Sequence, residues 1–274
     1  MKTTNTILAA HDFSPSSKNA LNIAAEIALK TDSKLLVYHV VSTSVLADTV
    51  STVNYSPDDE IKKNEGLLKR SVTALKKKFP ELKATGLVEF GFLIPTIADK
   101  IEEVKPWLMV LGVKKRSGFD KVIFGDVCST LVDKISTPLL VVPLNVKVMN
   151  LNTVAYAWDG KTSETTQLNP LKTLLGNTLS DIVSVNISHY DADVEKRANT
   201  FNAAVKKMFP QQQVDLKQIL GLDKETTMES ALDKMKPDLL VVFSHHYGFW
   251  KGLFHKSFAK QAVNFSKSPV LVVY

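Results

Sequence analysis

The sequence carries one pattern twice, at a constant offset of 131 residues. Residues 105–112 (KPWLMVLG) return as residues 236–243 (KPDLLVVF), and residues 136–143 (STPLLVVP) return as residues 267–274 (KSPVLVVY). Neither match needs a gap. Each of these segments ends in a short, apolar, β-branched run of the kind that forms a buried strand. The chain is therefore two copies of one module, and any fold proposed for it has to be built twice.

The repeat divides the chain into a first domain of residues 1–143, a linker of residues 144–152 and a second domain of residues 153–274. A length of 274 residues with 45% apolar side chains is enough for two domains that each have their own core. The linker contains no glycine-serine tract, so we expect the two domains to be held close together.

Within each copy, apolar runs of strand length alternate with segments of helical periodicity. In the first copy the expected strands are residues 7–11, 34–41, 84–91, 107–112 and 139–142. Five strands alternating with four helices predict an α/β class fold in which each domain is a doubly wound, open five-stranded parallel sheet with helices on both faces. Right-handed crossovers give the strand order 3-2-1-4-5, with strand 1 in the centre beside strand 4.

Two helix starts can be predicted from capping residues. Ser14 followed by Pro15 supplies an N-cap and a first-turn proline for the first helix. In the second copy Pro170 lies where the first copy has a mid-helix residue, so we expect that helix to start late, with Asn169 as its cap. The single cysteine, Cys128, falls on the apolar face of the helix before residues 136–143, which favours a buried structural thiol and a reducing compartment.

The net charge of +6 is spread along the chain, with 19 basic and 16 acidic side chains in residues 1–143 and 15 and 12 in the remainder. A nucleic-acid-binding protein usually concentrates basic residues on one element, so this even distribution argues against nucleic acid as a partner. No segment has the roughly 20 apolar residues of a membrane span, and the N-terminus has no signal-peptide pattern. We expect a cytoplasmic protein without a membrane partner.

Ligands of open α/β sheets bind at the carboxyl ends of the strands, where the strand order reverses. In the first copy this rule brings together Asp12, Val41 and the loop that begins at Gly112. That loop contains Lys114, Lys115 and Arg116, which serve equally well as a phosphate clamp or as a solvated surface. Asp12 is likewise either a ligand-binding carboxylate or a local cap for the next helix.

The start ILAAHDFSPSS, the HVV ending of the second strand and the loop, helix and strand of residues 112–143 resemble the universal stress proteins in their tandem two-domain form. The resemblance covers essentially the whole chain. It implies a stress-response protein with an adenine-nucleotide site, and it implies that the fifth strands of the two copies pair across a pseudo-twofold axis. An internal pseudo-dimer of this kind would cover two bare sheet edges. A further homodimer of two chains is left open.

ATP-binding members of that family have three glycines and a Ser or Thr after the fourth strand, spaced as G-x2-G-x9-G-[S/T]. Gly112 and Gly125 match the first and third glycines, whereas Lys115 and Asp126 replace the second glycine and the hydroxyl residue. A side chain at Lys115 crowds the phosphate path, and an ionised carboxylate at the helix start repels anions. The resemblance thus gives a candidate crevice in the first domain made of these residues: Asp12, Val41, Gly112, Lys115, Arg116, Gly125, Asp126, Val127.

The second copy has lost more of the pattern. Phe243, His246 and Lys256 stand at the glycine positions and only Ser257 is retained, while Asp159 matches Asp12. We therefore expect ATP or another adenylate in the first domain only. His245, His246 and His255 do not have the spacing of a zinc site, so no metal is predicted. The roles of these histidines and of the long polar connection that follows residue 42 are left open.

No catalytic triad, dinucleotide fingerprint or Walker loop is present. Three hypotheses follow for the function. The first is a nonenzymatic stress-response protein with a degenerate nucleotide site that acts through an unknown protein partner. The second is a sensor that binds ATP or a related adenylate in the first domain. The third is a slow ATPase. Binding of adenylates separates the first from the other two, and turnover separates the second from the third.

Overall fold

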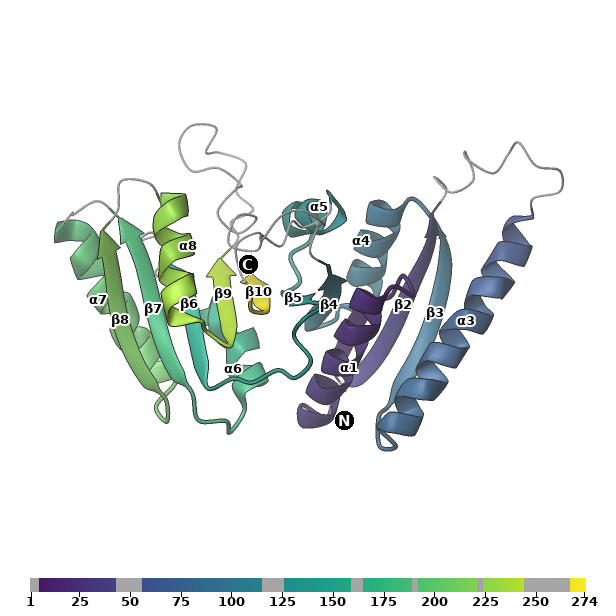
Figure 1. Ribbon diagram of the computed structural model, residues 1–274, viewed down its shortest axis with the longest axis horizontal. Helices are drawn as coiled ribbons and strands as arrows, with labels where there is room; N and C mark the ends of the chain where they lie inside the picture. The colour runs from purple at the N-terminus through teal and green to yellow at the C-terminus, as the bar shows by residue number, and fades with distance from the viewer. Residues whose placement is uncertain are drawn as a thin grey trace.

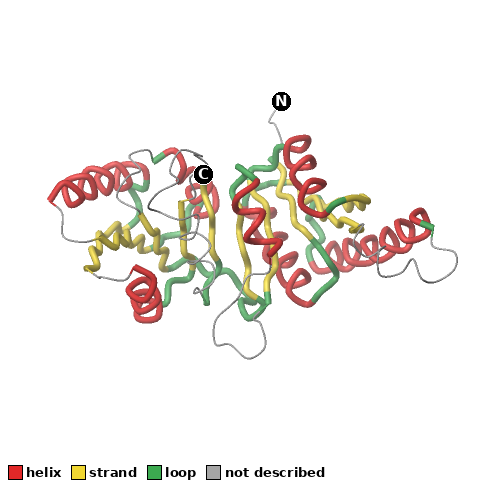
Figure 2. Tube along the Cα trace, turned by 90° about the horizontal axis from the view of Figure 1, so that it is seen from above, coloured by secondary structure: helices red, strands yellow, loops and turns green. Residues whose placement is uncertain are grey.

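A computed structural model of the chain describes residues 5–42, 56–114, 126–158, 165–188, 192–220, 224–243 and 267–274. Within these ranges the strands form one ten-stranded sheet in the order β3-β2-β1-β4-β5-β10-β9-β6-β7-β8 (Figure 1). The first five strands have the predicted order 3-2-1-4-5, and the last five repeat it outward from β10. Helices lie on both sides of the sheet (Figure 2), so the predicted doubly wound α/β architecture is confirmed.

The elements of the first half alternate as predicted, and each expected strand lies within one residue of its predicted ends. They are β1 (Thr6–Ala10), α1 (Pro15–Lys30), β2 (Lys34–Ser42), α3 (Pro57–Lys78), β3 (Ala84–Gly91), α4 (Leu93–Val104), β4 (Leu108–Val113), α5 (Asp126–Lys134) and β5 (Leu139–Pro143). All strand pairings in this half are parallel. The carboxyl ends of β1, β2 and β4 therefore share one edge of the sheet.

The second half repeats the alternation. Its elements are β6 (Thr153–Trp158), the short 3₁₀ helix η1 (Thr166–Leu168), α6 (Asn169–Leu175), β7 (Asp181–Ser188), α7 (Ala192–Met208), β8 (Gln213–Leu220), α8 (Lys224–Met235), β9 (Leu239–Phe243) and β10 (Val270–Val273). None of the helices in the part of the chain described above has the length and apolar character that a membrane span requires.

The two halves join through their fifth strands. β10 pairs antiparallel with β5, with Leu271 opposite Leu140, and every residue of both strands is buried. The predicted edge pairing is confirmed, and its physical reason is plain. Each strand would otherwise expose a row of unpaired backbone groups and a fully apolar side-chain set. Both cores cross this junction: one contains α1, α3, α6 and α7 side chains, and the other contains α4, α5 and α8 side chains.

Helix α1 also links the halves by polar contacts. The buried amide of Asn19 donates to the carbonyl oxygens of Val146 at 2.6 Å and Pro143 at 3.3 Å, which holds the linker against the helix. At the other end of α1, the Lys30 ammonium donates to Thr178 Oγ1 at 2.6 Å. These contacts hold α1 of the first half against the start of the linker and against the second half.

One capping prediction is confirmed and one is wrong. Ser14 is the N-cap of α1, and its hydroxyl accepts a hydrogen bond from the Ser17 amide at 3.2 Å. Asn169 does not cap α6, because its backbone is already helical (φ −55°, ψ −39°) and it is the first residue of the helix. The 3₁₀ turn η1 runs directly into the helix, so Leu168 takes the cap position and Pro170 falls within the first turn.

Candidate functional site

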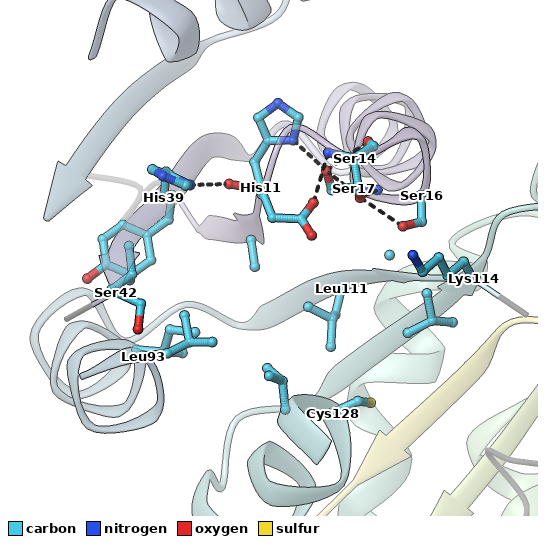
Figure 3. A pocket seen from close by; sticks show the side chains of 18 residues that line it. His11, Ser14, Ser16, Ser17, His39, Ser42, Leu93, Leu111, Lys114 and Cys128 are labelled. Atoms are coloured by element: carbon cyan, nitrogen blue, oxygen red, sulfur yellow. Dashed lines mark hydrogen bonds between the residues drawn. The ribbon is translucent and has the colours of Figure 1, made fainter. Parts of the chain in front are cut away.

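A cavity of about 620 Å³ opens at the carboxyl ends of β1, β2 and β4 in the first half. This is the switch point of the strand order, where the sequence predicted a crevice. Its two walls differ in polarity (Figure 3), as the following residues show: Ala10, His11, Asp12, Ser14, Ser16, Ser17, Tyr38, His39, Val40, Ser42, Leu93, Ile97, Leu111, Gly112, Val113, Lys114, Val127 and Cys128.

The N-terminus of α1 forms part of the polar wall. Ser14, Ser16 and Ser17 line the cavity, and the latter two are buried. Ser14 Oγ lies 2.9 Å from Ser16 Oγ, and Ser17 Oγ donates to the Ser14 carbonyl oxygen at 3.1 Å. The three hydroxyls therefore hydrogen-bond to one another and to the backbone of the first turn of the helix. They lie at the positive end of the helix dipole, which faces the cavity.

Asp12 follows β1 and presents an exposed carboxylate to the same wall. Its Oδ1 accepts a hydrogen bond from the Ser14 amide at 3.0 Å. Partial burial acts to raise the pKa of Asp12, but hydrogen bonds from Ser14 and Ser17 outweigh it and bring the pKa below its ordinary value. Asp12 is therefore ionised at neutral pH and acts only as a hydrogen-bond acceptor. The local hydrogen-bonding role is confirmed by this contact with Ser14, and the ligand-binding role stays a prediction for a residue that lines the cavity.

Two histidines stand beside Asp12. The His11 ring is buried, with Nδ1 at 2.9 Å from Ser17 Oγ and Nε2 at 3.1 Å from Ser71 Oγ of α3. Burial lowers its pKa from 6.5 to about 4, so the ring is neutral in the folded protein. His39 Nδ1 donates to the His11 carbonyl oxygen at 2.7 Å, which requires the proton of the His39 ring to be on Nδ1 whenever that ring is neutral.

The opposite wall is apolar. It is made by Leu93 and Ile97 of α4, Leu111 of β4, and Val127 and Cys128 of α5. Figure 3 shows Leu93, Leu111 and Cys128 facing the serine and histidine side chains across the cavity. Cys128 is 2% exposed, and burial raises the pKa of its thiol, so the predicted buried thiol is confirmed. Such a wall suits a flat apolar group and offers it no hydrogen bonds.

Tyr38 closes the cavity between these walls. Its hydroxyl donates to Glu89 Oε2 at 2.5 Å, and burial together with this bond raises the pKa of Tyr38. Lys100 bridges Glu89 and Glu103 at 2.6 and 2.5 Å. Burial acts to raise the pKa of Glu89, but its hydrogen bonds from Lys100 and Tyr38 lower it overall. The tyrosine is therefore held in one position, with its hydroxyl engaged by Glu89.

Gly112 lies where β4 passes the first turn of α1. A Cβ added there would lie within 3.0 Å of the Ser16 carbonyl and the Ser17 amide. These are backbone atoms, so they have little freedom to move. The structure thus gives this glycine a packing reason, which is independent of the phosphate approach that the family pattern assigns to it.

The structure brings three of the predicted site residues to the cavity, namely Asp12, Gly112 and Val127. Val41 is buried in β2 and is absent from the described lining, whereas its neighbours Val40 and Ser42 line the cavity. Asp126 begins α5, but its side chain lies outside what is described. The remaining predicted residues and histidines lie outside the described residues: Lys115, Arg116, Gly125, Asp159, His245, His246, His255, Ser257.

Sequence reasoning missed His11 and His39. Both follow from the rule that was applied to Asp12, because His11 directly follows β1 and His39 lies near the carboxyl end of β2. Their contribution to the wall could have been predicted from position, although their hydrogen bonds could not. Across the described ranges no group of three histidine, cysteine or carboxylate side chains could hold a metal ion.

Comparison with known proteins agrees with this arrangement. Residues 3–143 match the Universal stress protein family. Comparison with curated proteins gives no match. Among solved structures, a universal stress protein from Archaeoglobus fulgidus superposes with a TM-score of 0.78 at 16% identity, covering 98% of each chain. A Pseudomonas aeruginosa protein of unknown function gives 0.62 at 13% identity, covering 98% of this chain and 92% of its own. At these identities the structural matches establish the fold alone, but the family match extends over half the sequence, and the chain belongs to the universal stress protein family.

Proposed function

We propose that this chain is a nonenzymatic stress-response protein that binds an adenylate with a short phosphate chain in its first half and acts through a protein partner. The observation that carries the proposal is the two-walled cavity at the strand switch point. An ionised carboxylate and a helix N-terminus face an apolar wall across it. That combination suits a ligand with one flat apolar part and one part rich in hydroxyls or phosphate.

The residues present fit the two ends of such a ligand. The apolar wall of Leu93, Leu111 and Val127 would cover a base by contact alone. The exposed Asp12 carboxylate would accept hydrogen bonds from ribose hydroxyls. Lys114 lines the cavity beside the start of α1, where its ammonium would attract a phosphate (Figure 3).

The phosphate end sets the expected length of the ligand. Lys115 and Asp126 replace a glycine and a hydroxyl residue of the ATP-binding pattern, and packing against α1 already accounts for Gly112. A carboxylate beside a triphosphate disfavours binding by about 1 to 2 kcal/mol, which corresponds to roughly a tenfold loss. A monophosphate places less charge near that carboxylate. AMP is therefore the preferred probe over ATP.

The arrangement of Ser17 and His11 supports a role without catalysis. Ser17 Oγ lies 2.9 Å from His11 Nδ1, as a nucleophile and its base would, but the same hydroxyl also lies 3.1 Å from the Ser14 carbonyl oxygen and hydrogen-bonds to Asp12, so His11 is one of several partners for its single proton. A pKa of about 4 further makes His11 a weak base at neutral pH. His11 is therefore a poor activator of Ser17 at neutral pH.

Calorimetric titration with AMP and ATP tests the proposal. We expect AMP to bind the parent more tightly than ATP, and the double variant Lys115→Gly, Asp126→Ser to gain about tenfold or more in ATP affinity. Asp12→Asn should weaken AMP binding, whereas Asp159→Asn, the matched change in the second copy, should leave it unaltered. Tight ATP binding by the parent with no gain in the double variant would refute the assignment of the phosphate end. Loss of AMP binding in Asp159→Asn but not in Asp12→Asn would show that AMP binds in the second half, contrary to the proposal.

A further inference from the structure

Phe13 has an unusual backbone for its residue type. Its φ is 64°, in the left-handed region that bulky side chains rarely adopt. Among the described residues the other non-glycine positions with positive φ are Asp32, Lys105 and Lys236. Each of these follows the end of a helix, where a left-handed residue is an ordinary terminator. Phe13 instead precedes a helix, and it stands between the carboxylate of Asp12 and the N-cap of α1.

The Phe13 ring makes specific contacts that hold this backbone in place. It meets the His11 ring edge-on, with centroids 4.9 Å apart and planes at 70°. It lies against the His39 ring at 4.6 Å and 47°. It also packs against the core on the α1 and α3 side of the sheet. The ring therefore contacts two imidazoles, one that directly follows β1 and one in β2.

Phe13 is not part of the cavity lining, although the two histidines that it contacts and both of its chain neighbours are. His11, Asp12, Ser14 and His39 all line the cavity. The left-handed turn at Phe13 also lets the Ser14 amide reach back to Asp12 Oδ1 at 3.0 Å. Any influence of Phe13 on a ligand must therefore pass through these neighbours.

We propose that Phe13 is the positioning residue of the crevice: its ring fixes the His39 imidazole against the His11 carbonyl and thereby holds the turn that presents Asp12 to the ligand. The inference rests on the proposed adenylate function. It assigns part of the affinity for the adenylate to a residue that does not itself line the cavity. Without the ring, His39 is free to rotate and to exchange its proton between the two nitrogens. The turn then loses the contact that keeps a bulky residue left-handed.

The test compares Phe13→Gly, which keeps the left-handed backbone accessible, with Phe13→Leu and with Phe13→Tyr, which keeps the ring. Long-range proton-nitrogen NMR at neutral pH reads which His39 nitrogen carries the proton, with His39→Gln used for assignment. AMP titration measures affinity. Leu174→Ala, a buried change in α6 of the second half, controls for lost stability alone. Phe13→Leu serves if the glycine variant does not fold.

We expect the parent and Phe13→Tyr to show His39 protonated on Nδ1, and Phe13→Gly and Phe13→Leu to show a mixture of tautomers with AMP binding at least tenfold weaker. Leu174→Ala should match the parent in both measurements. An unchanged His39 signal in Phe13→Gly and Phe13→Leu overturns the inference, whatever the affinity does. Parental AMP affinity in both variants overturns it as well. If the parent does not bind AMP but the His39 signal changes, the proposed function fails and the positioning role stands.

Discussion

The neutrality of His11 predicts a pH-dependent loss of stability. The buried ring keeps a pKa of about 4, against 6.5 for a histidine in the unfolded chain. Burial is the main cause, and the positive charges of His39 and Lys18 act in the same direction, whereas Asp12 opposes them. At pH values between these two pKa values, the His11 ring binds a proton in the unfolded state but not in the folded state. Stability is therefore complete above about pH 6.5 and falls as the pH is lowered toward 4.

The magnitude follows from the gap between the two values. The full contribution of His11 corresponds to about 3 kcal/mol, of which about 2 kcal/mol should be lost between pH 7 and pH 5. The free energy of unfolding is a few times larger in a typical domain, so such a change is easily measured. Below pH 4 the folded state also binds the proton and the loss levels off.

Urea denaturation followed by tryptophan fluorescence, at several pH values from 7.5 to 4.5, measures this effect on the parent and on His11→Gln. All other ionisable groups are common to both proteins, so the difference between the two isolates His11. We expect His11→Gln to be less stable than the parent at pH 7 and to lose about 2 kcal/mol less than the parent on going to pH 5. Parallel curves for the two proteins would show that His11 is not held neutral, and the reasoning from burial would be refuted.

Three further predictions concern single positions. Gly112→Ala should lower the free energy of unfolding by about 1 to 3 kcal/mol, because the new Cβ meets backbone atoms. Gly66→Ala, in α3 with nothing within 4 Å, should raise it by about 0.5 to 1 kcal/mol. Equal effects of the two changes in urea denaturation would contradict the close approach at Gly112. Lys105→Gly and Lys236→Gly should each raise the melting temperature, since both positions are left-handed and a non-glycine residue there costs about 1 kcal/mol. Cys128 should react with a thiol reagent only on unfolding, and rapid labelling of the native protein would argue against its burial.

The fold was predictable because its signals are repeated and local. The apolar runs that became β4 and β5 recur as β9 and β10 at one offset, so each strand assignment had an independent second instance. Strand order then followed from crossover handedness, which leaves few alternatives. The late start of α6 near Pro170 was predicted correctly, but its cap was not: a 3₁₀ turn can continue into a helix without an extended residue between them, and capping preferences do not reveal this.

The site was only partly predictable, because its properties depend on which side chains meet. Asp12 and Gly112 were located from the end-of-strand rule, and the structure brings both to the cavity. The contact between His11 and Ser71 joins residues that are 60 positions apart in the sequence. It depends on how α3 packs against the sheet, which no local sequence pattern predicts. The left-handed backbone of Phe13 was equally hidden, since phenylalanine is a poor predictor of such a conformation.

The two copies also show why function cannot be transferred along the repeat. At the offset of 131 residues Lys105 and Lys236 share the same left-handed backbone, and the amides of Trp107 and Asp238 make equivalent hydrogen bonds to the carbonyls of Thr6 and Thr153. The side chains at the second pair of positions do unrelated work. The Trp107 indole donates to a serine hydroxyl at 3.0 Å, whereas Asp238 Oδ2 accepts two backbone amides at 2.9 and 3.0 Å. Backbone hydrogen bonds fix the fold of the module, whereas side chains fix its chemistry. A nucleotide site in the first copy is therefore no evidence for one in the second, and each crevice has to be tested with its own variants.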